Sequence, residues 1–191
     1  FYSNQGDYTK SLYYAIDTRK ELIRSKDTLN MYRVYEMLGD IHRAMDEPHN
    51  SIKYYNEYLL LAPFNNINIM NISRLLLNEH IKINRAEQGL NSFKKYIAKH
   101  PSLQLNQKHY VAAILGDGYT ALRQFSKAEK RYLEMLDINE KLIGSHRFST
   151  TFTSNLVGAE TYLILAKFYT VRKYYSEVHR YATRVLMAPN L

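Results

Sequence analysis

The sequence predicts an all-α fold, and three observations lead to that prediction. Its 191 residues include 18 Tyr and 7 Phe but only 4 Pro and 7 Gly. This is too many large apolar side chains for a disordered chain, and too few turn-forming residues for a sandwich of short strands. Apolar residues also recur at steps of three and four, as one face of a helix requires. Finally, one pattern of residues occurs four times along the chain.

The clearest helical pattern lies between Met31 and Pro63. Apolar residues follow Met31 at three- and four-residue steps until Asp46-Glu47-Pro48 interrupts them. Proline suits the first turn of a new helix, where its missing N–H would have no partner in any case. The same steps then continue through Ile52 and Leu59. We therefore predict two helices joined by a tight turn near Asp46.

Three further segments share the spacing of this first pair. Each unit opens with a leucine, in the pairs Leu38-Gly39, Leu76-Leu77, Leu115-Gly116 and Leu165-Ala166. Twelve residues after the second member stands a mostly small residue, namely Ser51, Gly89, Ala128 and Val178. Seventeen residues after the leucine stand Tyr55, Phe93, Tyr132 and Ala182. Small side chains let two helices approach while aromatic ones fill the space beside them, so the spacing predicts four helix pairs. Their turns should lie near Asp46, Asn84, Gln124 and Lys173.

The start of a second helix carries a further signal in two units. Ser126 and Ser176 stand where a hydroxyl can accept from the free N–H groups of a first helical turn. We expect them to cap the second helices of the last two pairs.

These residues resemble the tetratricopeptide repeat (TPR) family, whose helix-turn-helix unit is normally 34 residues long. One unit that looks complete has Leu38-Gly39, His42, Ser51, Tyr55, Tyr58, Leu59 and Pro63. Another has Leu115-Gly116, Tyr119, Phe125, Ala128, Tyr132 and Leu136. Near the start, Tyr2, Gly6-Asp7-Tyr8 and Ser11 look like the end of a first helix and the whole of a second. The units at Leu76 and Leu165 are more degenerate, and the leucine-to-leucine steps exceed the family's usual length.

The resemblance implies a right-handed α-solenoid of antiparallel helix pairs with about nine helices. We expect a single TPR-like domain over residues 1–191. It would hold a half repeat at 1–25 and repeats at about 27–63, 66–101, 103–143 and 150–189. Because such stacks need polar capping helices at their ends, we expect the chain to be a fragment of a longer protein.

Composition and motifs argue against an enzyme. The absence of cysteine excludes thiol nucleophiles, disulfides and Cys-ligated metals. No two histidines have the helical zinc-protease spacing, so we expect no metal and no cofactor. His42 and His80 occupy a position that holds Tyr119 and Tyr169 in the other units, and we expect them to be buried, hydrogen-bonded packing residues. No stretch is apolar enough to span a membrane. The sequence does not decide between a cytoplasmic and a periplasmic location.

TPR arrays usually bind a peptide or another protein along a groove lined by their first helices. The resemblance therefore implies a non-enzymatic scaffold for protein–protein interaction. The candidate groove residues are Arg33, Glu36, Asp40, Arg43, Asn71, Arg74, Asn78, Lys82, Tyr110, Asp117, Glu160 and Lys167. For each of them a solvated helix face is an equally good interpretation. The subtype that grips the C-terminal carboxylate of heat-shock chaperones is matched only in part: Arg74 and Asn78 fit, but the next first helix offers Tyr110, Ala113 and Ile114.

Two alternatives from other classes stay open. The chain could be the sensory or regulatory region of a bacterial signalling protein, such as a histidine kinase or a transcription regulator, since those proteins carry similar widely spaced repeats. Nucleic-acid binding is a minor alternative, suggested by 26 Lys+Arg against 18 Asp+Glu and a net charge of +8. Dispersed solvated charges explain that excess better than one aligned basic face. The oligomeric state and the partner are not predicted.

Overall fold

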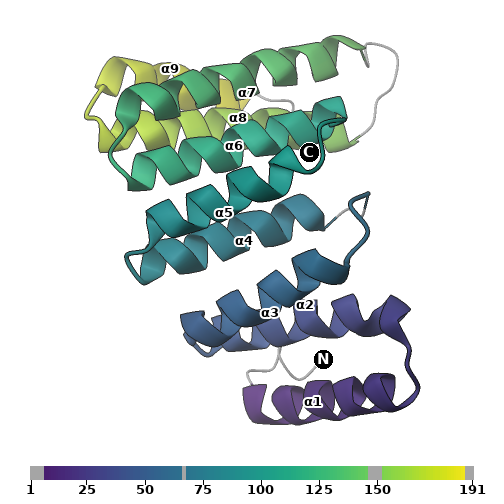
Figure 1. Ribbon diagram of the computed structural model, residues 1–191. Helices are drawn as coiled ribbons and strands as arrows, with labels where there is room; N and C mark the ends of the chain where they lie inside the picture. Colours follow the sequence, from purple (N-terminus) through teal and green to yellow (C-terminus); the bar gives the residue numbers. More distant parts are fainter. Residues whose placement is uncertain (1–6, 66–67, 146–151, 188–191) are drawn as a thin grey trace. The chain divides into compact units, whose positions relative to one another are not determined.

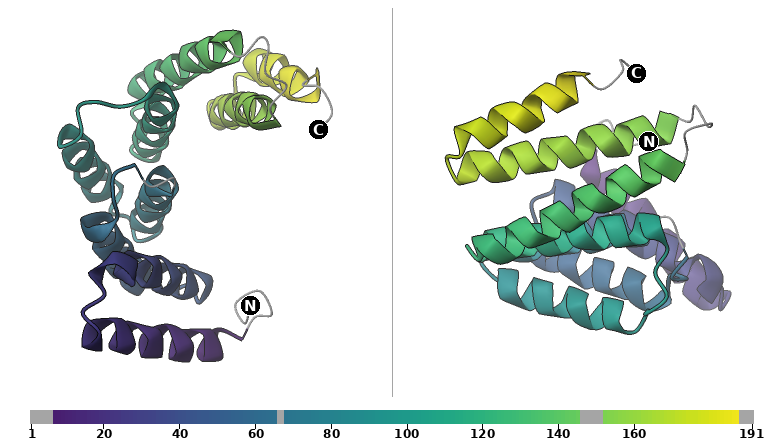
Figure 2. Two further views of the ribbon diagram at one scale, coloured as in Figure 1. Left: turned by 90° about the vertical axis from the view of Figure 1, so that its right-hand side faces the viewer. Right: turned by 90° about the horizontal axis from the view of Figure 1, so that it is seen from above.

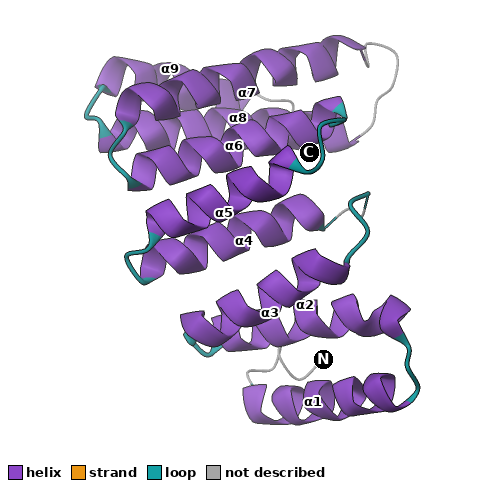
Figure 3. Cartoon of the chain, in the orientation of Figure 1, coloured by secondary structure: helices purple, strands orange, loops and turns teal. Residues whose placement is uncertain are grey.

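The computed structural model describes residues 7–65, 68–145 and 152–187 (Figure 1). Every regular element in these ranges is an α-helix, which confirms the predicted all-α class (Figure 3). The helices of the described chain are α1 (Tyr8–Arg24), α2 (Thr28–Ala44), α3 (Pro48–Leu61), α4 (Ile69–Lys82), α5 (Ala86–Ala98), α6 (Leu105–Ala121), α7 (Phe125–Ser145), α8 (Phe152–Val171) and α9 (Tyr175–Met187). None of these helices has the length and hydropathy that crossing a bilayer requires.

The chain divides into two compact units, residues 1–100 and 101–191. The first contains α1 to α5 and the second α6 to α9, and in each unit helices that follow one another in sequence pack together. The pairs α2–α3, α4–α5, α6–α7 and α8–α9 correspond to the four predicted repeats, and α1 to the predicted half repeat. The predicted limits at residues 1, 66, 150, 189 and 191 lie outside the described residues. The single-domain organisation and the right-handed superhelix stay predictions.

One turn type closes all four pairs and also joins α1 to α2. In each turn one non-glycine residue is left-handed, with φ between 56° and 60°: Lys26, Asp46, Asn84, Arg123 and Lys173. The N–H of the following residue donates to the carbonyl five positions back at 2.8–3.0 Å. This is the Schellman arrangement that satisfies the last carbonyls of a helix. The predicted turns are confirmed at Asp46, Asn84 and Lys173, and the remaining one lies at Arg123, one residue before Gln124.

The predicted serine caps are wrong. Helix α7 begins at Phe125 and α9 at Tyr175, so Ser126 and Ser176 are the second residues of their helices. The reason is that the Schellman turn sets the start of the next helix two residues after its left-handed residue. Side-chain caps do occur earlier in the chain, where Asp7 accepts from the backbone N–H of Lys10 at 3.1 Å. Asp27 caps α2 in the same way, accepting from Asn30 at 3.2 Å.

Glycines control how closely the helices of a pair approach. A Cβ placed on Gly39 of α2 would lie 2.5 Å from Cδ1 of Tyr55 in α3. On Gly116 of α6, a Cβ would lie 2.6 Å from Cδ1 of Tyr132 in α7. In the α4–α5 pair Leu77 stands where the other two pairs have the first-helix glycine, and a Cβ on Gly89 of the second helix would lie 2.7 Å from Cβ of His80. The expected role of small residues at these positions is therefore confirmed at all three glycines.

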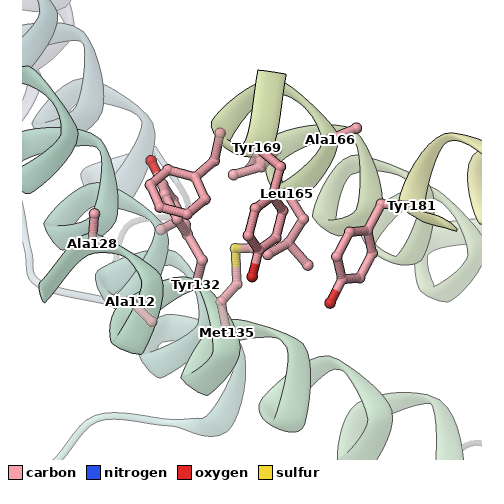
Figure 4. Packing of buried hydrophobic residues seen from close by; sticks show 11 residues of the cluster. Ala112, Ala128, Tyr132, Met135, Leu165, Ala166, Tyr169 and Tyr181 are labelled. Carbon is pink, nitrogen blue, oxygen red and sulfur yellow. The ribbon is translucent and has the colours of Figure 1, made fainter. Parts of the chain in front are cut away.

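Aromatic and aliphatic side chains fill the space between the pairs. In the second unit Tyr132 and Met135 of α7 pack against Leu165 and Tyr169 of α8, while the ring of Tyr181 from α9 stacks on that of Tyr169 (Figure 4). In the first unit Tyr55, Tyr58 and Leu38 are completely buried, along with Ile69, Leu77 and Leu90. Each helix pair therefore contributes one layer to the core of its unit.

Candidate functional site

The predicted site residues of α2 lie along one side of that helix. Arg33, Glu36, Asp40 and Arg43 follow at steps of three, four and three, which places them one above the other. Arg33 and Arg43 are exposed, whereas Glu36 and Asp40 are half-buried. The core-facing residues of the same helix, such as Leu38, occupy the opposite side.

Helix α4 carries a second polar face. Asn71, Arg74, Asn78 and Lys82 follow at steps of three and four. Three of them are exposed and Arg74 is half-buried. The amides of Asn71 and Asn78 form no hydrogen bond within the described part of the chain.

Two contacts bring the polar faces of α2 and α4 together. At one end, Nδ2 of Asn68, just before α4, donates to Oε1 of Glu36 at 2.9 Å. At the other end, Nζ of Lys82 lies 3.6 Å from Oδ1 of Asp46 in the α2–α3 turn. In the left view of Figure 2, α2 and α4 lie on one side of the first unit and α3 and α5 on the other. We call the surface that carries the eight predicted residues of this unit the α2–α4 face.

Part of this face is occupied by internal contacts. The hydroxyl of Tyr55 donates to Oδ1 of Asp40 at 2.6 Å, and Nε of Arg43 donates to the same hydroxyl oxygen at 3.2 Å. Arg43 also lies 3.8 Å from Asp40. Asp40 and Arg43 therefore hold the first helix pair together, and a ligand would have to share them with Tyr55.

Glu36 has an altered electrostatic environment. Burial, followed by the nearby charge of Asp40, raises the pKa of Glu36 above its ordinary value. The hydrogen bond from Asn68 acts in the opposite direction and partly offsets this. Ionisation of Glu36 therefore costs more free energy than ionisation of an exposed glutamate. The exposed guanidinium of Arg33 lies nearby.

One charged residue of this region was missed by the sequence analysis. Glu79 of α4 has only 1% of its surface exposed, and its Oε1 accepts from Lys82 at 3.0 Å. Its other oxygen, Oε2, has no hydrogen-bond partner in the described structure. In the sequence, only the three-residue spacing between Glu79 and Lys82 points to this contact, and many exposed ion pairs have the same spacing. Lys82 therefore lies within ion-pair distance of two carboxylates, the exposed one of Asp46 and the buried one of Glu79.

The second unit holds a separate set of predicted residues. Tyr110 and Asp117 lie two turns apart on α6, and Glu160 and Lys167 two turns apart on α8. These helices are linked by a buried contact of 2.9 Å between Nε2 of His109 and Oγ1 of Thr161. As in the first unit, the aspartate is engaged internally, since Tyr132 donates its hydroxyl to Asp117 at 2.8 Å. All predicted residues of this set except the exposed Lys167 are half-buried.

The two packing histidines differ. His42 is buried, stacks on Tyr54 and makes a 2.6 Å contact through Nδ1 with Oε2 of Glu47, as expected. His80 is also buried, but its Nδ1 has no hydrogen-bond partner in the described structure, so the expected hydrogen bond is missing at that atom. Burial, followed by the charge of Arg85, lowers the pKa of His80.

Several basic residues of the second unit are engaged by acidic or aromatic neighbours. Arg131 pairs with Glu134 at 2.7 Å, and Arg180 pairs with Glu177 at 3.4 Å. Arg172 lies 2.9 Å from Glu129 and over the ring of Tyr174. These cations are partly neutralised, which weakens the argument for a phosphate-binding face.

Within the described ranges, no cluster of His, Asp and Glu is arranged to hold a metal ion. Comparison of the sequence with known protein families and with curated proteins gives no match. The TPR resemblance therefore stays an interpretation of the repeat spacing and is not supported by an independent relative.

Proposed function

We propose that this protein is a non-enzymatic scaffold of TPR-like repeats that binds an extended segment of another protein on the α2–α4 face. The observation that carries the proposal is the link between Asn68 and Glu36, supported by the contact of Lys82 with Asp46. These contacts connect the two polar helix faces at their ends, which supports a shared surface.

The chemistry of this surface suits a peptide backbone. Asn71 and Asn78 each offer an amide donor and acceptor on one side of α4, about two turns apart. An extended peptide presents N–H and C=O groups that such amides can pair with in both directions. Arg33, at the exposed edge of α2, adds a guanidinium that can hold a carboxylate of the ligand.

The surface is already ordered before binding. Tyr55 fixes Asp40 and Arg43, and Asn68 fixes Glu36. A preformed surface spares the entropic cost of arranging these side chains when the ligand arrives. Binding of a flexible peptide is thereby favoured, because besides the ligand only exposed side chains such as Asn71 and Asn78 have to be ordered.

The proposal is tested by selecting peptides from a random-sequence display library on the intact protein and measuring their affinity for variants. The variant Arg33→Ala/Asn71→Ala/Asn78→Ala removes the available groups without touching the Tyr55 contacts. We expect it to weaken the selected peptides about tenfold or more. The matched control Asn91→Ala/Gln88→Ala, on exposed positions of α5, should leave the affinity unchanged. Equal binding to all three proteins would refute the proposal.

A further inference from the structure

A groove lies between α3 and α5, with α4 as its floor. It has a volume of about 290 Å³ and is lined by residues of these three helices and by Lys99, which caps the end of α5. Ser73, Leu76 and Leu77 of α4 and Phe93 of α5 are buried and form its bottom. We call this feature the α3–α5 groove.

The groove is distinct from the α2–α4 face. At 100° per residue, Ser73, Leu76 and Leu77 point to the side of α4 away from Asn71, Arg74 and Asn78. A ligand in the α3–α5 groove would contact only residues that the proposed peptide site does not use.

Its chemistry is apolar with a basic wall. Its lining contains no Asp or Glu, while Lys95 of α5 and Lys99, the residue that caps this helix, stand one turn apart. Both lysines are exposed, and neither forms an ion pair within the described chain. On the opposite wall Leu60 of α3 has 75% of its surface in contact with solvent, although it borders the groove. A ligand that covers Leu60 and meets the two lysines must be apolar on one side and acidic on another.

We propose that the α3–α5 groove binds an acidic amphipathic helix of a partner protein. On α5 the lining runs from Gly89 to Lys99, which is about 15 Å of helix. An amphipathic helix that anchors by residues i, i+3 or i+4, and i+7 places them over about 10 Å, so three anchors fit this length. Leucine-like anchors would occupy the floor and cover Leu60, and Asp or Glu beside them would face Lys95 and Lys99.

A helix fits better than a small amphiphile for one reason. A volume of 290 Å³ lies at the lower end of the range for enclosed small-molecule pockets, which is about 300–1,000 Å³. Leu60 extends the apolar surface beyond the concavity, and a ligand confined to the cavity would leave it exposed. A helix laid along α5 covers both the cavity and this edge.

The test uses a fluorescein-labelled peptide of about 14 residues with leucines at i, i+4 and i+7 and glutamates beside them. Fluorescence anisotropy follows its titration with the intact protein. We expect saturable binding that weakens about tenfold in Leu60→Glu and again in Lys95→Glu/Lys99→Glu. Because all three side chains are exposed, helical circular dichroism should show that these variants are folded.

Matched controls separate specific from general effects. Leu29→Glu, at an equally exposed leucine of α2, and Lys108→Glu/Lys130→Glu, at two exposed lysines of the second unit, should bind as the wild type does. A peptide of scrambled order and one with lysine in place of glutamate should bind much more weakly.

Five results would overturn the proposal, of which four come from the titrations. They are no saturable binding at about 1 mM peptide, equal binding of the scrambled peptide, equal binding to the groove variants, and saturable binding of dodecanoate with no binding of the peptide. A concentration-dependent dimer that Leu60→Glu abolishes would also overturn it, because the groove would then be covered by a second copy of the chain.

Discussion

The hydroxyl of Tyr55 donates a 2.6 Å hydrogen bond to Asp40, and Tyr132 donates one of 2.8 Å to Asp117. In both pairs the two residues are separated by 15 positions, and a glycine precedes the aspartate. The glycine leaves room for the ring, and the aspartate receives its hydroxyl. Leu-Gly-Asp on the first helix and Tyr on the second therefore form one packing unit, present in two of the four helix pairs. Asp40 and Asp117 have a structural role whether or not a ligand also contacts them.

Because the tyrosine rings occupy the space where a Cβ would be, alanine should be destabilising at either glycine. We expect Gly39→Ala and Gly116→Ala each to lower the free energy of unfolding by about 1–3 kcal/mol, as overpacking of a core does. This loss should outweigh the higher helix propensity of alanine, which is worth about 1 kcal/mol. Urea denaturation measures it. In a Tyr55→Leu background, Gly39→Ala should cost much less, and an equal cost in both backgrounds would contradict the packing explanation.

Removal of the tyrosine hydroxyl should also lower the free energy of unfolding. Burial, followed by the hydrogen bond to Asp40, raises the pKa of Tyr55, so the hydroxyl stays protonated and remains a donor. We expect Tyr55→Phe and Tyr132→Phe each to lose about 1.5–3 kcal/mol of unfolding free energy, the value for a hydrogen bond to a charged group. Tyr54→Phe is the control, because its hydroxyl forms no hydrogen bond within the described structure. If all three variants had the same stability by denaturant titration, the hydrogen bonds would contribute nothing.

The stability of the first unit should fall on mild acidification. Burial lowers the pKa of His80 below its ordinary value of 6.5, so the unfolded chain binds a proton more readily than the folded one. The contribution of neutral His80 is therefore present above pH 6.5 and is lost as the pH falls toward the folded-state pKa. We expect His80→Leu to reduce the loss of unfolding free energy between about pH 7.5 and 5.5. His49→Gln, at an exposed position, serves as the control, and a pH profile of His80→Leu identical to the wild type would contradict the assignment.

A C-terminal Glu-Glu-Val-Asp peptide should not bind measurably. Arg74 and Asn78 could serve one half of the chaperone-carboxylate clamp, but the residues expected to complete it do not fit. Ala113 and Ile114 are 2% and 1% exposed and carry no polar group. Isothermal titration calorimetry should show no saturable heat at micromolar concentrations. Saturation in that range would mean that a different set of residues forms the clamp.

The helix pairs were predictable because their determinants are local. Turn residues, leucine positions and the small-aromatic spacing all repeat with a fixed offset inside each unit, and the structure has the pairs at those places. The capping prediction failed at Ser126 and Ser176 because a Schellman turn depends on backbone conformation at Arg123 and Lys173. Nothing in the sequence of those turns shows it, since neither residue is a glycine or an asparagine.

The site was predictable only as a set of helix faces. The spacing placed Arg33, Glu36 and Asp40 on one side of α2, but not the contact of Glu36 with Asn68, which joins residues 32 positions apart. The engagement of Asp40 by Tyr55 did have a signal, because aspartate occurs at this position only where Gly precedes it and Tyr follows 15 residues later. No signal in the sequence indicates the burial of Glu79, because burial of a charge depends on the neighbouring helix.

The most direct test of the account is to locate a library-selected peptide on the isotope-labelled protein by NMR. We predict that the amide shift changes in the first unit concentrate at the exposed positions of α2 and α4, around Arg33, Asn71 and Asn78, and leave Leu60 and Lys95 unchanged. Shift changes confined to the second helices, or scattered over both units without saturation, would contradict the assignment of the α2–α4 face as the binding surface.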